Sequence, residues 1–327
     1  MDVFDITIIG AGPTGLFGAF YAGLREMKAK IIEALPEPGG QLTTLYPEKY
    51  IYDSPGYPKI LSKDLVKLLV EQAYEYEPAM FLGERVKSLR YIDGGTIELG
   101  TDKGLHHSRT VVISAGFGAF SPNRLGVPGE KELDGRGVFY FVRNKEDLRG
   151  KRVLIVGGGD SAVDWALNLK DIADVTLVHR RDIFRALERN VKDLLSSNVS
   201  VKLFYELKEV HGDGSVEAAT IMNNQTKEQI EIPVDAVLLF LGYRAELGPI
   251  KDWGLELEGR SIVVNGRMET NLPRIYAAGD IITQPDAAKL NLIATGFSQA
   301  AIAVNLAKKS LDPTAPTFEH SSEKIKS

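Results

Sequence analysis

Residues 6–15 read ITIIGAGPTG, an apolar run that ends in a turn containing Gly10, Gly12, Pro13, Thr14 and Gly15. A turn of this kind joins a buried strand to a helix. Its first glycine lets the chain turn sharply, its second lets the backbone approach a ligand, and its third lets the helix pack closely on the strand. The free N–H groups at the start of the helix suit a pyrophosphate. The sequence therefore predicts a dinucleotide-binding unit at its N-terminus.

An acidic residue follows at the place where a ribose is expected. Glu33 comes 21 residues after Gly12 and closes a second apolar run at residues 29–32. A carboxylate at the end of a strand there can accept hydrogen bonds from both ribose hydroxyls of an adenosine. The first site therefore suits an adenosine without a 2′-phosphate, such as that of FAD.

A second strand–turn–helix pattern starts at residues 152–156 (RVLIV) and continues into the turn GGGDSA at residues 157–162. The next apolar run, residues 174–178, ends in His179, Arg180 and Arg181, with Arg185 four residues further on. Guanidinium groups at this place suit a 2′-phosphate, which they bind through paired charged hydrogen bonds. A solvated basic loop is the alternative interpretation. We expect NADPH to bind at Gly157, Gly159, Asp160, Ser161, Ala162, His179, Arg180, Arg181 and Arg185.

The composition excludes several other classes of function. The chain has 327 residues, a net charge of −5, five histidines and no cysteine, so it forms no disulfide and offers no spacing typical of a metal site. Its charge argues against a nucleic-acid partner. No apolar stretch approaches the roughly 20 residues of a membrane span, and a strand at the N-terminus leaves no room for a signal peptide. We expect a cytoplasmic enzyme that binds no metal.

The two halves of the chain repeat the same order of elements. Strands are expected at residues 84–92, 96–101 and 110–114, and again at 201–210, 216–222 and 236–241, with Asp-Gly turns that are typical of hairpins and a polar turn between the last two strands. A strand and turn at 274–281 and a helix at about 295–309 should return to the first domain. The predicted fold is α/β, with two Rossmann-like, three-layer ββα dinucleotide-binding domains. The FAD domain is discontinuous (residues 1–117 and 246–327), and the NADPH domain spans residues 118–245.

These motifs, in this order, resemble the low-molecular-weight thioredoxin reductase family over essentially the whole chain. The resemblance includes the SAG strand end at 114–116 and the YAAGD segment at 276–280. Those reductases carry a Cys-x-x-Cys pair shortly before the second glycine turn, but the corresponding residues 137–145 (GVFYFVRNK) contain no thiol. The chain therefore resembles the cysteine-free branch, the thioredoxin-reductase-like ferredoxin–NADP reductases. That branch shares the GGQL turn at 39–42, the YPEKYIYD segment at 46–53 and a C-terminal tail with His320.

The resemblance implies roles for individual residues. Tyr50 would stack on one face of the isoalloxazine, and His320 would cover the other, in related reductases often from the partner subunit of a homodimer. Asp280, after Gly279, would hydrogen-bond the ribityl chain of FAD. Other residues expected around FAD are Gly40, Gln41, Tyr46, Asp53, Val86, Gly116, Phe120 and, more weakly, Ser321.

Thr295 lies at the start of the last predicted helix. If this N-terminus abuts the flavin pyrimidine, its positive end stabilises the negative charge that builds there on reduction. The hypothesis is that the helix raises the reduction potential of the flavin.

The resemblance implies a FAD-dependent oxidoreductase that passes a hydride from NADPH to FAD and then single electrons to ferredoxin or a flavodoxin-type carrier. The reverse direction, reduction of NADP⁺, uses the same sites, and no acid or base residue is required. Two alternatives remain open. One is an NADPH oxidase or diaphorase acting on oxygen or quinones, and the other is a non-catalytic flavoprotein that senses NADP(H). The sequence decides neither the natural acceptor nor the direction.

Overall fold

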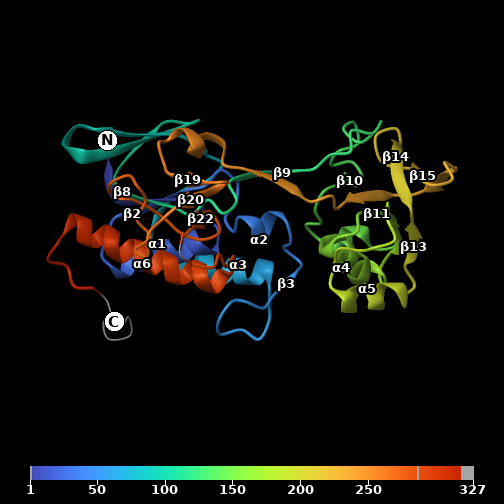
Figure 1. Ribbon diagram of the computed structural model, residues 1–327, viewed down its shortest axis with the longest axis horizontal. Coiled ribbons are helices and arrows are strands. Elements are labelled where there is room, and N and C mark those ends of the chain that lie inside the picture. Colours follow the sequence, from blue (N-terminus) through green and yellow to red (C-terminus); the bar gives the residue numbers. More distant parts are fainter. Residues whose placement is uncertain (1, 286, 318–327) are drawn as a thin grey trace. The chain divides into compact units, whose positions relative to one another are not determined.

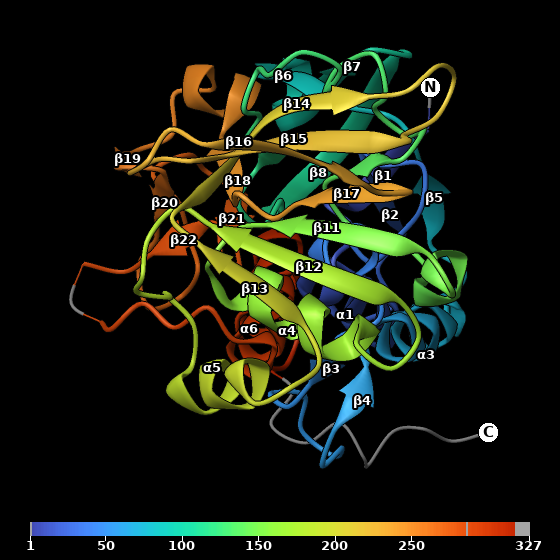
Figure 2. The ribbon, with the colours of Figure 1, turned by 90° about the vertical axis from the view of Figure 1, so that its right-hand side faces the viewer.

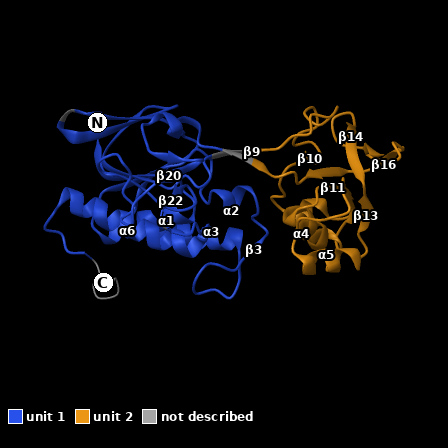
Figure 3. Ribbon diagram, viewed as in Figure 1, with its two compact units in different colours: residues 1–120, 245–327 blue, residues 121–244 orange. Residues whose placement is uncertain are grey.

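The computed structural model describes residues 2–285 and 287–317, and the chain divides into two compact units. Unit 1 comprises residues 1–120 and 245–327, and unit 2 comprises residues 121–244 (Figure 3). Unit 1 is therefore discontinuous in sequence.

Unit 1 is built on a parallel sheet. The N-terminal apolar run forms β1 (Val3–Ile9), which pairs with β2 (Ala29–Ile32) on one side and β8 (Leu105–Ile113) on the other. β5 (Ala79–Phe81) pairs with β2, and β21 (Ile275–Ala277) pairs with the end of β8. Because β21 comes from the C-terminal part of the chain, the returning segment completes the first sheet.

Three helices cover one face of this sheet (Figure 1). They are α1 (Pro13–Leu24), α3 (Ser62–Tyr74) and α6 (Ile293–Leu311), and α1 packs between the other two. The buried residues of α6 recur every three or four positions, at Ala300, Ala303, Val304 and Ala307. This spacing gives one apolar stripe, and its small residues let α6 approach α1 closely. The helix expected at about 295–309 lies within α6.

An antiparallel meander adds β6 (Val86–Ile92) and β7 (Thr96–Thr101) to β8, with the turn η1 (Asp93–Gly95) between β6 and β7. β8 begins earlier than the expected strand at 110–114. Its first half continues the hairpin with β7, and its second half runs in the parallel sheet. β8 therefore belongs to both the antiparallel meander and the parallel sheet of unit 1.

The remaining elements of unit 1 are short. They are α2 (Gln41–Thr44), β3 (Tyr50–Ile51), β4 (Ile60–Leu61), η3 (Gly248–Asp252), β19 (Leu257–Glu258), β20 (Ser261–Val263) and β22 (Ile282–Thr283).

Unit 2 repeats the architecture (Figure 2). Its parallel sheet has the order β10 (Val138–Phe139), β17 (Ala236–Leu239), β11 (Arg152–Val156), β12 (Asp174–His179) and β13 (Ser200–Leu203). The helices α4 (Asp160–Leu169) and α5 (Glu188–Leu195) lie on one face, and the other face carries a meander of β14 (Tyr205–His211), β15 (Ala218–Asn223) and β16 (Gln229–Pro233). Unit 2 also contains η2 (Lys145–Leu148), and the pair β9 (Ala119–Pro122) and β18 (Tyr243–Glu246) lies where the chain passes from one unit to the other.

Two expectations for unit 2 are wrong. The single strand expected at 201–210 is divided at Phe204, whose φ of 65° breaks the extended backbone, so that β13 joins the parallel sheet and β14 joins the meander. The stretch expected as a polar turn before residue 236 contains β16. Its buried side, Ile230 and Ile232, alternates with polar or Pro residues, and the two isoleucines alone were too weak a pattern to recognise.

The apolar core of unit 2 shows its three layers directly. Val153 and Ile155 of β11 pack in a cluster with Trp165 of α4. Leu154 and Val156, on the opposite face of the same strand, pack in a second cluster on the meander side. A strand buried on both faces in this way reads as a continuous apolar run, which is why residues 152–156 were recognisable from sequence.

Candidate functional site

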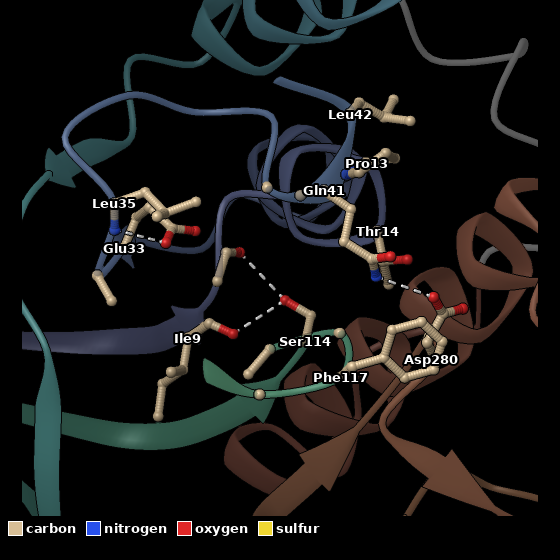
Figure 4. Close-up of a pocket in the computed structure, with 18 of the residues that line it drawn as sticks. Ile9, Pro13, Thr14, Glu33, Leu35, Gln41, Leu42, Ser114, Phe117 and Asp280 are labelled. Atoms are coloured by element: carbon tan, nitrogen blue, oxygen red, sulfur yellow. Dashed lines mark hydrogen bonds between the residues drawn. The ribbon is translucent and has the colours of Figure 1, made fainter. Parts of the chain in front are cut away.

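A pocket of about 380 Å³ lies in unit 1, where β1, β2 and β8 end (Figure 4). Ile9, Glu33 and Ser114, at or just after the ends of these strands, all line it. The hydroxyl of Ser114 donates to the carbonyl oxygens of Ile9 and Gly10 at 3.1 and 3.2 Å, which ties the end of β8 to the glycine turn. The carboxyl ends of parallel strands are the usual place for a ligand in such a sheet.

The first glycine turn serves both the fold and the pocket. Gly10 has a φ of 107°, and a Cβ there would come within 2.5 Å of the carbonyl oxygen of Ser114. Within residues 2–285 and 287–317, a Cβ on Gly12 would meet no atom within 4 Å, although Gly12 lines the pocket and caps α1 without a side-chain partner. The protein itself therefore requires a glycine at position 10. The open backbone at position 12 fits a pyrophosphate against the helix N-terminus.

Glu33 is held in place at one end of the pocket. Its side chain is only 6% exposed, and its carboxylate accepts hydrogen bonds from the N–H groups of Ala11 at 2.6 Å and Leu35 at 2.8 Å. Burial raises the pKa of this carboxyl above its ordinary value, and these N–H bonds act against the rise. Each oxygen keeps acceptor capacity for a ligand hydroxyl. The arrangement can therefore bind a ribose, as the sequence predicts.

A second group of polar side chains lies where α2 and the turn after β21 meet. The amide of Gln41 donates to the carboxylate of Asp280 at 3.2 Å, and Figure 4 shows the two side chains pointing toward each other. Burial raises the pKa of Asp280, and burial next to Asp280 raises the pKa of Tyr46 to about 12. Asp53 accepts the N–H of Ile293 at 2.8 Å and so caps α6.

Most of the residues expected around FAD line this one pocket. They are Gly10, Gly12, Pro13, Thr14, Glu33, Gly40, Gln41, Tyr46, Asp53, Val86, Gly116, Gly279 and Asp280. Gly15 and Thr295 do not line it. Gly15 packs α1 against the glycine turn, where a Cβ would overlap the carbonyl of Gly10, and the hydroxyl of Thr295 donates to the carbonyls of Leu290 and Leu292.

Tyr50 also lies outside the set of lining residues. Its side chain is 44% exposed, and the ammonium of Lys59 lies 4.8 Å from the centre of its ring. His320, Ser321 and the side chain of Phe120 lie outside the described part of the protein, so their expected roles stay predictions.

Sequence reasoning missed two parts of the pocket wall. One is Arg85, which stands beside the expected Val86 and whose charge lowers the pKa of Glu33. The other is the segment around η3, which contributes Leu247, Pro249, Ile250 and Trp253. The apolar spacing of Ile250 and Trp253 was the only local signal for that segment. No pattern in the sequence connects it to a glycine turn more than 200 residues earlier.

The glycine turn of unit 2 has the same construction. Gly157 has a φ of 153°, and a Cβ there would approach the carbonyl oxygen of Phe240 to 2.6 Å. Gly159 precedes α4, which has no side-chain cap, and the protein atom nearest to a Cβ on Gly159 would be 3.9 Å away. In the first turn of α4, Ala162 is buried and Ser161 is exposed. The backbone at position 159 is thus open to a ligand, like that at position 12.

The expected arginines follow β12. Arg180, Arg181 and Arg185 are exposed, and no carboxylate among the described residues forms an ion pair with them. Burial, and then the three arginines, lower the pKa of His179. The structure therefore brings the glycine turn together with three exposed arginines that form no ion pair among the described residues of unit 2.

No group of three or more metal-ligating side chains occurs within residues 2–285 and 287–317. Among the helices in that same part of the chain, none combines the length and the apolar character that crossing a membrane requires.

Comparison with known proteins agrees with this geometry. Residues 4–305 match the pyridine nucleotide-disulphide oxidoreductase family. A ferredoxin–NADP reductase from Symbiobacterium thermophilum is 53% identical, covering 98% of this chain and 97% of the relative. A ferredoxin–NADP reductase from Sulfurisphaera tokodaii is 52% identical, covering 99% and 98%. Among solved structures, thioredoxin reductase from T. acidophilum has a TM-score of 0.77 at 26% identity, covering 96% of this chain and 100% of that one.

The fold and the two glycine turns define a two-domain oxidoreductase of the dinucleotide-binding class. This chain belongs to the pyridine nucleotide-disulphide oxidoreductase family. The comparisons confirm the expected fold class and the resemblance drawn from the sequence motifs.

Proposed function

We propose that this protein is a ferredoxin–NADP reductase. The observation that carries the proposal is a thioredoxin reductase fold without a single cysteine. A reductase of this fold that acts on disulfides needs a dithiol to receive electrons, and this chain has none. Relatives that share about half of its residues over their full length are ferredoxin–NADP reductases.

Unit 1 is the FAD domain in this proposal. When bound, FAD accepts a hydride from NADPH and releases the electrons singly. Glu33 would bind the adenosine ribose, the backbone at Gly12 would bind the pyrophosphate, and Asp280, positioned by Gln41, would bind the ribityl chain. Tyr50 and, from the tail, His320 and Ser321 would flank the isoalloxazine. The backbone at Gly12 supports this assignment, because no atom of the described residues lies within 4 Å of the place where its Cβ would stand.

Unit 2 is the NADPH domain. The N-terminus of α4 would bind the pyrophosphate, and Arg180, Arg181 and Arg185 would bind the 2′-phosphate. These arginines are exposed and form no ion pair within the described chain, which supports this role. Basic residues that only keep the surface soluble have no reason to cluster beside a glycine turn.

Ferredoxin is the electron carrier that the names of the relatives favour, and a flavodoxin-type carrier would use the same chemistry. We further propose a cytoplasmic homodimer without a nucleic-acid or membrane partner. The net charge of −5 supports the absence of nucleic acid.

The proposal is tested by following NADPH oxidation aerobically with and without ferredoxin, with peroxide measured in parallel. The proposal predicts that ferredoxin accelerates NADPH oxidation and that little peroxide forms without ferredoxin, since the reduced protein itself reacts slowly with oxygen. Stoichiometric peroxide with no response to ferredoxin would contradict it and favour an NADPH oxidase.

A further inference from the structure

Residues 180–187, here called the arginine loop, connect β12 to α5 in unit 2 (Figure 2). The loop carries all three arginines assigned to the 2′-phosphate. It folds back against the glycine turn instead of extending into solvent: Gly159 and Arg185 form an isolated parallel bridge, and the N–H of Arg185 donates to the carbonyl of Gly158 at 2.7 Å. The pyrophosphate site and the 2′-phosphate site are thus built on backbone segments that contact each other.

The imidazole of His179 contacts two residues in the middle of the arginine loop. Its Nε2 lies 3.0 Å from the carbonyl oxygen of Ile183, and its ring stacks on Phe184 with centres 5.0 Å apart. The ring also fills the space where a Cβ of residue 158 would stand, which requires a glycine at that position. These contacts hold the middle of the loop, whereas its end is held differently.

Asp160 holds the end of the loop. Its Oδ1 accepts the N–H of Leu187, the residue that caps α5, at 3.0 Å. A carboxylate in the first turn of α4 interacts favourably with the positive end of the helix but would repel a pyrophosphate bound there. Its bond to Leu187 gives it a partner in the arginine loop.

We propose that Asp160 is a positioning residue that sets the preference for NADPH over NADH by fixing the arginine loop to the glycine turn. The inference rests on the proposed NADPH site. A nucleotide must meet the helix N-terminus and the arginines at the same time, so a loop that is already ordered spares the ligand the cost of ordering it. The ordered loop therefore strengthens the binding only of nucleotides that carry a 2′-phosphate, because NADH has no such group for the arginines to bind.

The test measures binding of two probes to the FAD-loaded protein by calorimetry: 2′,5′-ADP, which carries the 2′-phosphate, and 5′-AMP, which lacks it. Asp160→Ala should weaken 2′,5′-ADP about tenfold, the effect of losing one hydrogen bond to a charged acceptor, and weaken 5′-AMP less than about twofold. Asp160→Asn keeps an acceptor oxygen and should stay within about threefold of the wild type for 2′,5′-ADP. In turnover, Asp160→Ala should raise KM for NADPH with a much smaller effect on kcat.

A second variant breaks the same bond from the other side. Leu187 has a φ of −55°, which proline adopts, so Leu187→Pro removes the N–H donor without touching the glycine turn. It should reproduce the selective loss of 2′,5′-ADP binding. Asp182→Asn is the matched control, because it removes a negative charge from the exposed loop and should weaken neither probe.

Equal weakening of both probes by Asp160→Ala and Leu187→Pro, or no weakening by either, would overturn the inference. The double variant Arg180→Ala, Arg181→Ala separates this outcome from failure of the proposed function. If the double variant leaves 2′,5′-ADP binding unchanged, the NADPH site itself is wrong. If it weakens binding while the Asp160 and Leu187 variants do not, only the positioning role fails.

Discussion

Gly10 and Gly12 lie in the same turn, but a side chain would have different consequences at the two positions. The positive φ of Gly10 and the carbonyl of Ser114 close to its missing Cβ are properties of the protein alone. Among the described residues, no atom lies within 4 Å of a Cβ built on Gly12, so the fold itself does not exclude a side chain there. This difference makes it possible to separate folding from cofactor binding by substitution at two positions two residues apart.

Gly12→Ala should fold with a free energy of unfolding close to that of the wild-type apoprotein and should fail to retain FAD, because the methyl group occupies the place of the pyrophosphate. Gly10→Ala should lose stability by about 2 kcal/mol or more, since alanine is strained at a φ of 107° and meets Ser114. Flavin content after purification and urea unfolding of the apoprotein measure the two effects. Full FAD retention by Gly12→Ala would contradict the assignment of the Gly12 backbone to the pyrophosphate.

Lys30 of β2 is a charge buried in the core of unit 1. It is 1% exposed, its ammonium donates to the carbonyl of His107 at 3.2 Å, and it lies 4.5 Å from the centre of the Phe4 ring. Burial lowers the pKa of Lys30 to about 8, although Glu84 acts against this. The unfolded chain therefore binds more protons than the folded one between about pH 8 and the ordinary lysine value, so this group makes stability rise with pH through that window.

Lys30→Met should raise the free energy of unfolding at pH 7 by about 1–3 kcal/mol, because it removes the cost of burying a charged group, reduced by the lost bond to His107. The advantage should shrink as the pH rises toward 10, where the lysine is neutral in the fold. Urea unfolding at pH 7 and pH 9.5 measures it. The exposed Lys28→Met is the control and should change stability by less than about 0.5 kcal/mol. A pH-independent difference would contradict this account.

At the scale of elements, the strand–turn–helix units were predictable because every part of them is local. Residues 152–156 form a continuous apolar run because β11 is buried on both faces, and the glycines follow at fixed positions. The division at Phe204 was not predictable, since a positive φ at a phenylalanine has no signature in composition. Nor was the pocket wall at Trp253, because the contact depends on how a segment from far along the chain returns to unit 1.

The candidate site also contains some residues that the sequence predicts and others that it does not. Glu33 was found because it follows a strand at the expected distance from a glycine, whereas Asp280 was expected from resemblance, and both line the pocket. Tyr50 was expected from resemblance alone, and it does not line the pocket. Arg85 lines it but carries no motif, and a basic residue before a buried valine is common on surface strands.

The N-terminus of α6 forms one wall of the pocket through Leu292 and Ile293, and the carboxylate of Asp53 already caps it. If the pyrimidine of the flavin meets this wall, Thr295→Asp should lower the midpoint potential of bound FAD by about 10–20 mV, because it adds negative charge at the helix end. Asp53→Asn should raise it by a similar amount, and Thr295→Asn is the uncharged control. Redox titration against a reference dye measures the shift. Unchanged midpoints in both charge variants would contradict a role for this helix.

At the scale of the whole molecule, the chain repeats one architecture and gives the two copies different charges. Unit 1 places a carboxylate, Glu33, at the ribose position, and unit 2 places arginines there. That contrast supports the proposal that unit 1 binds FAD and unit 2 binds NADPH. The chain contains no cysteine, so neither unit can exchange electrons with a disulfide through a thiol.

The central claim is that electrons pass from NADPH through the flavin to ferredoxin. The most direct test is anaerobic: NADPH is mixed with the FAD-loaded protein while flavin absorbance is followed, and oxidised ferredoxin is then added. The account predicts bleaching by NADPH and recovery on addition of ferredoxin, with reduced ferredoxin appearing in proportion. Bleaching without recovery would contradict ferredoxin as the acceptor, and the absence of bleaching would contradict the transfer from NADPH itself.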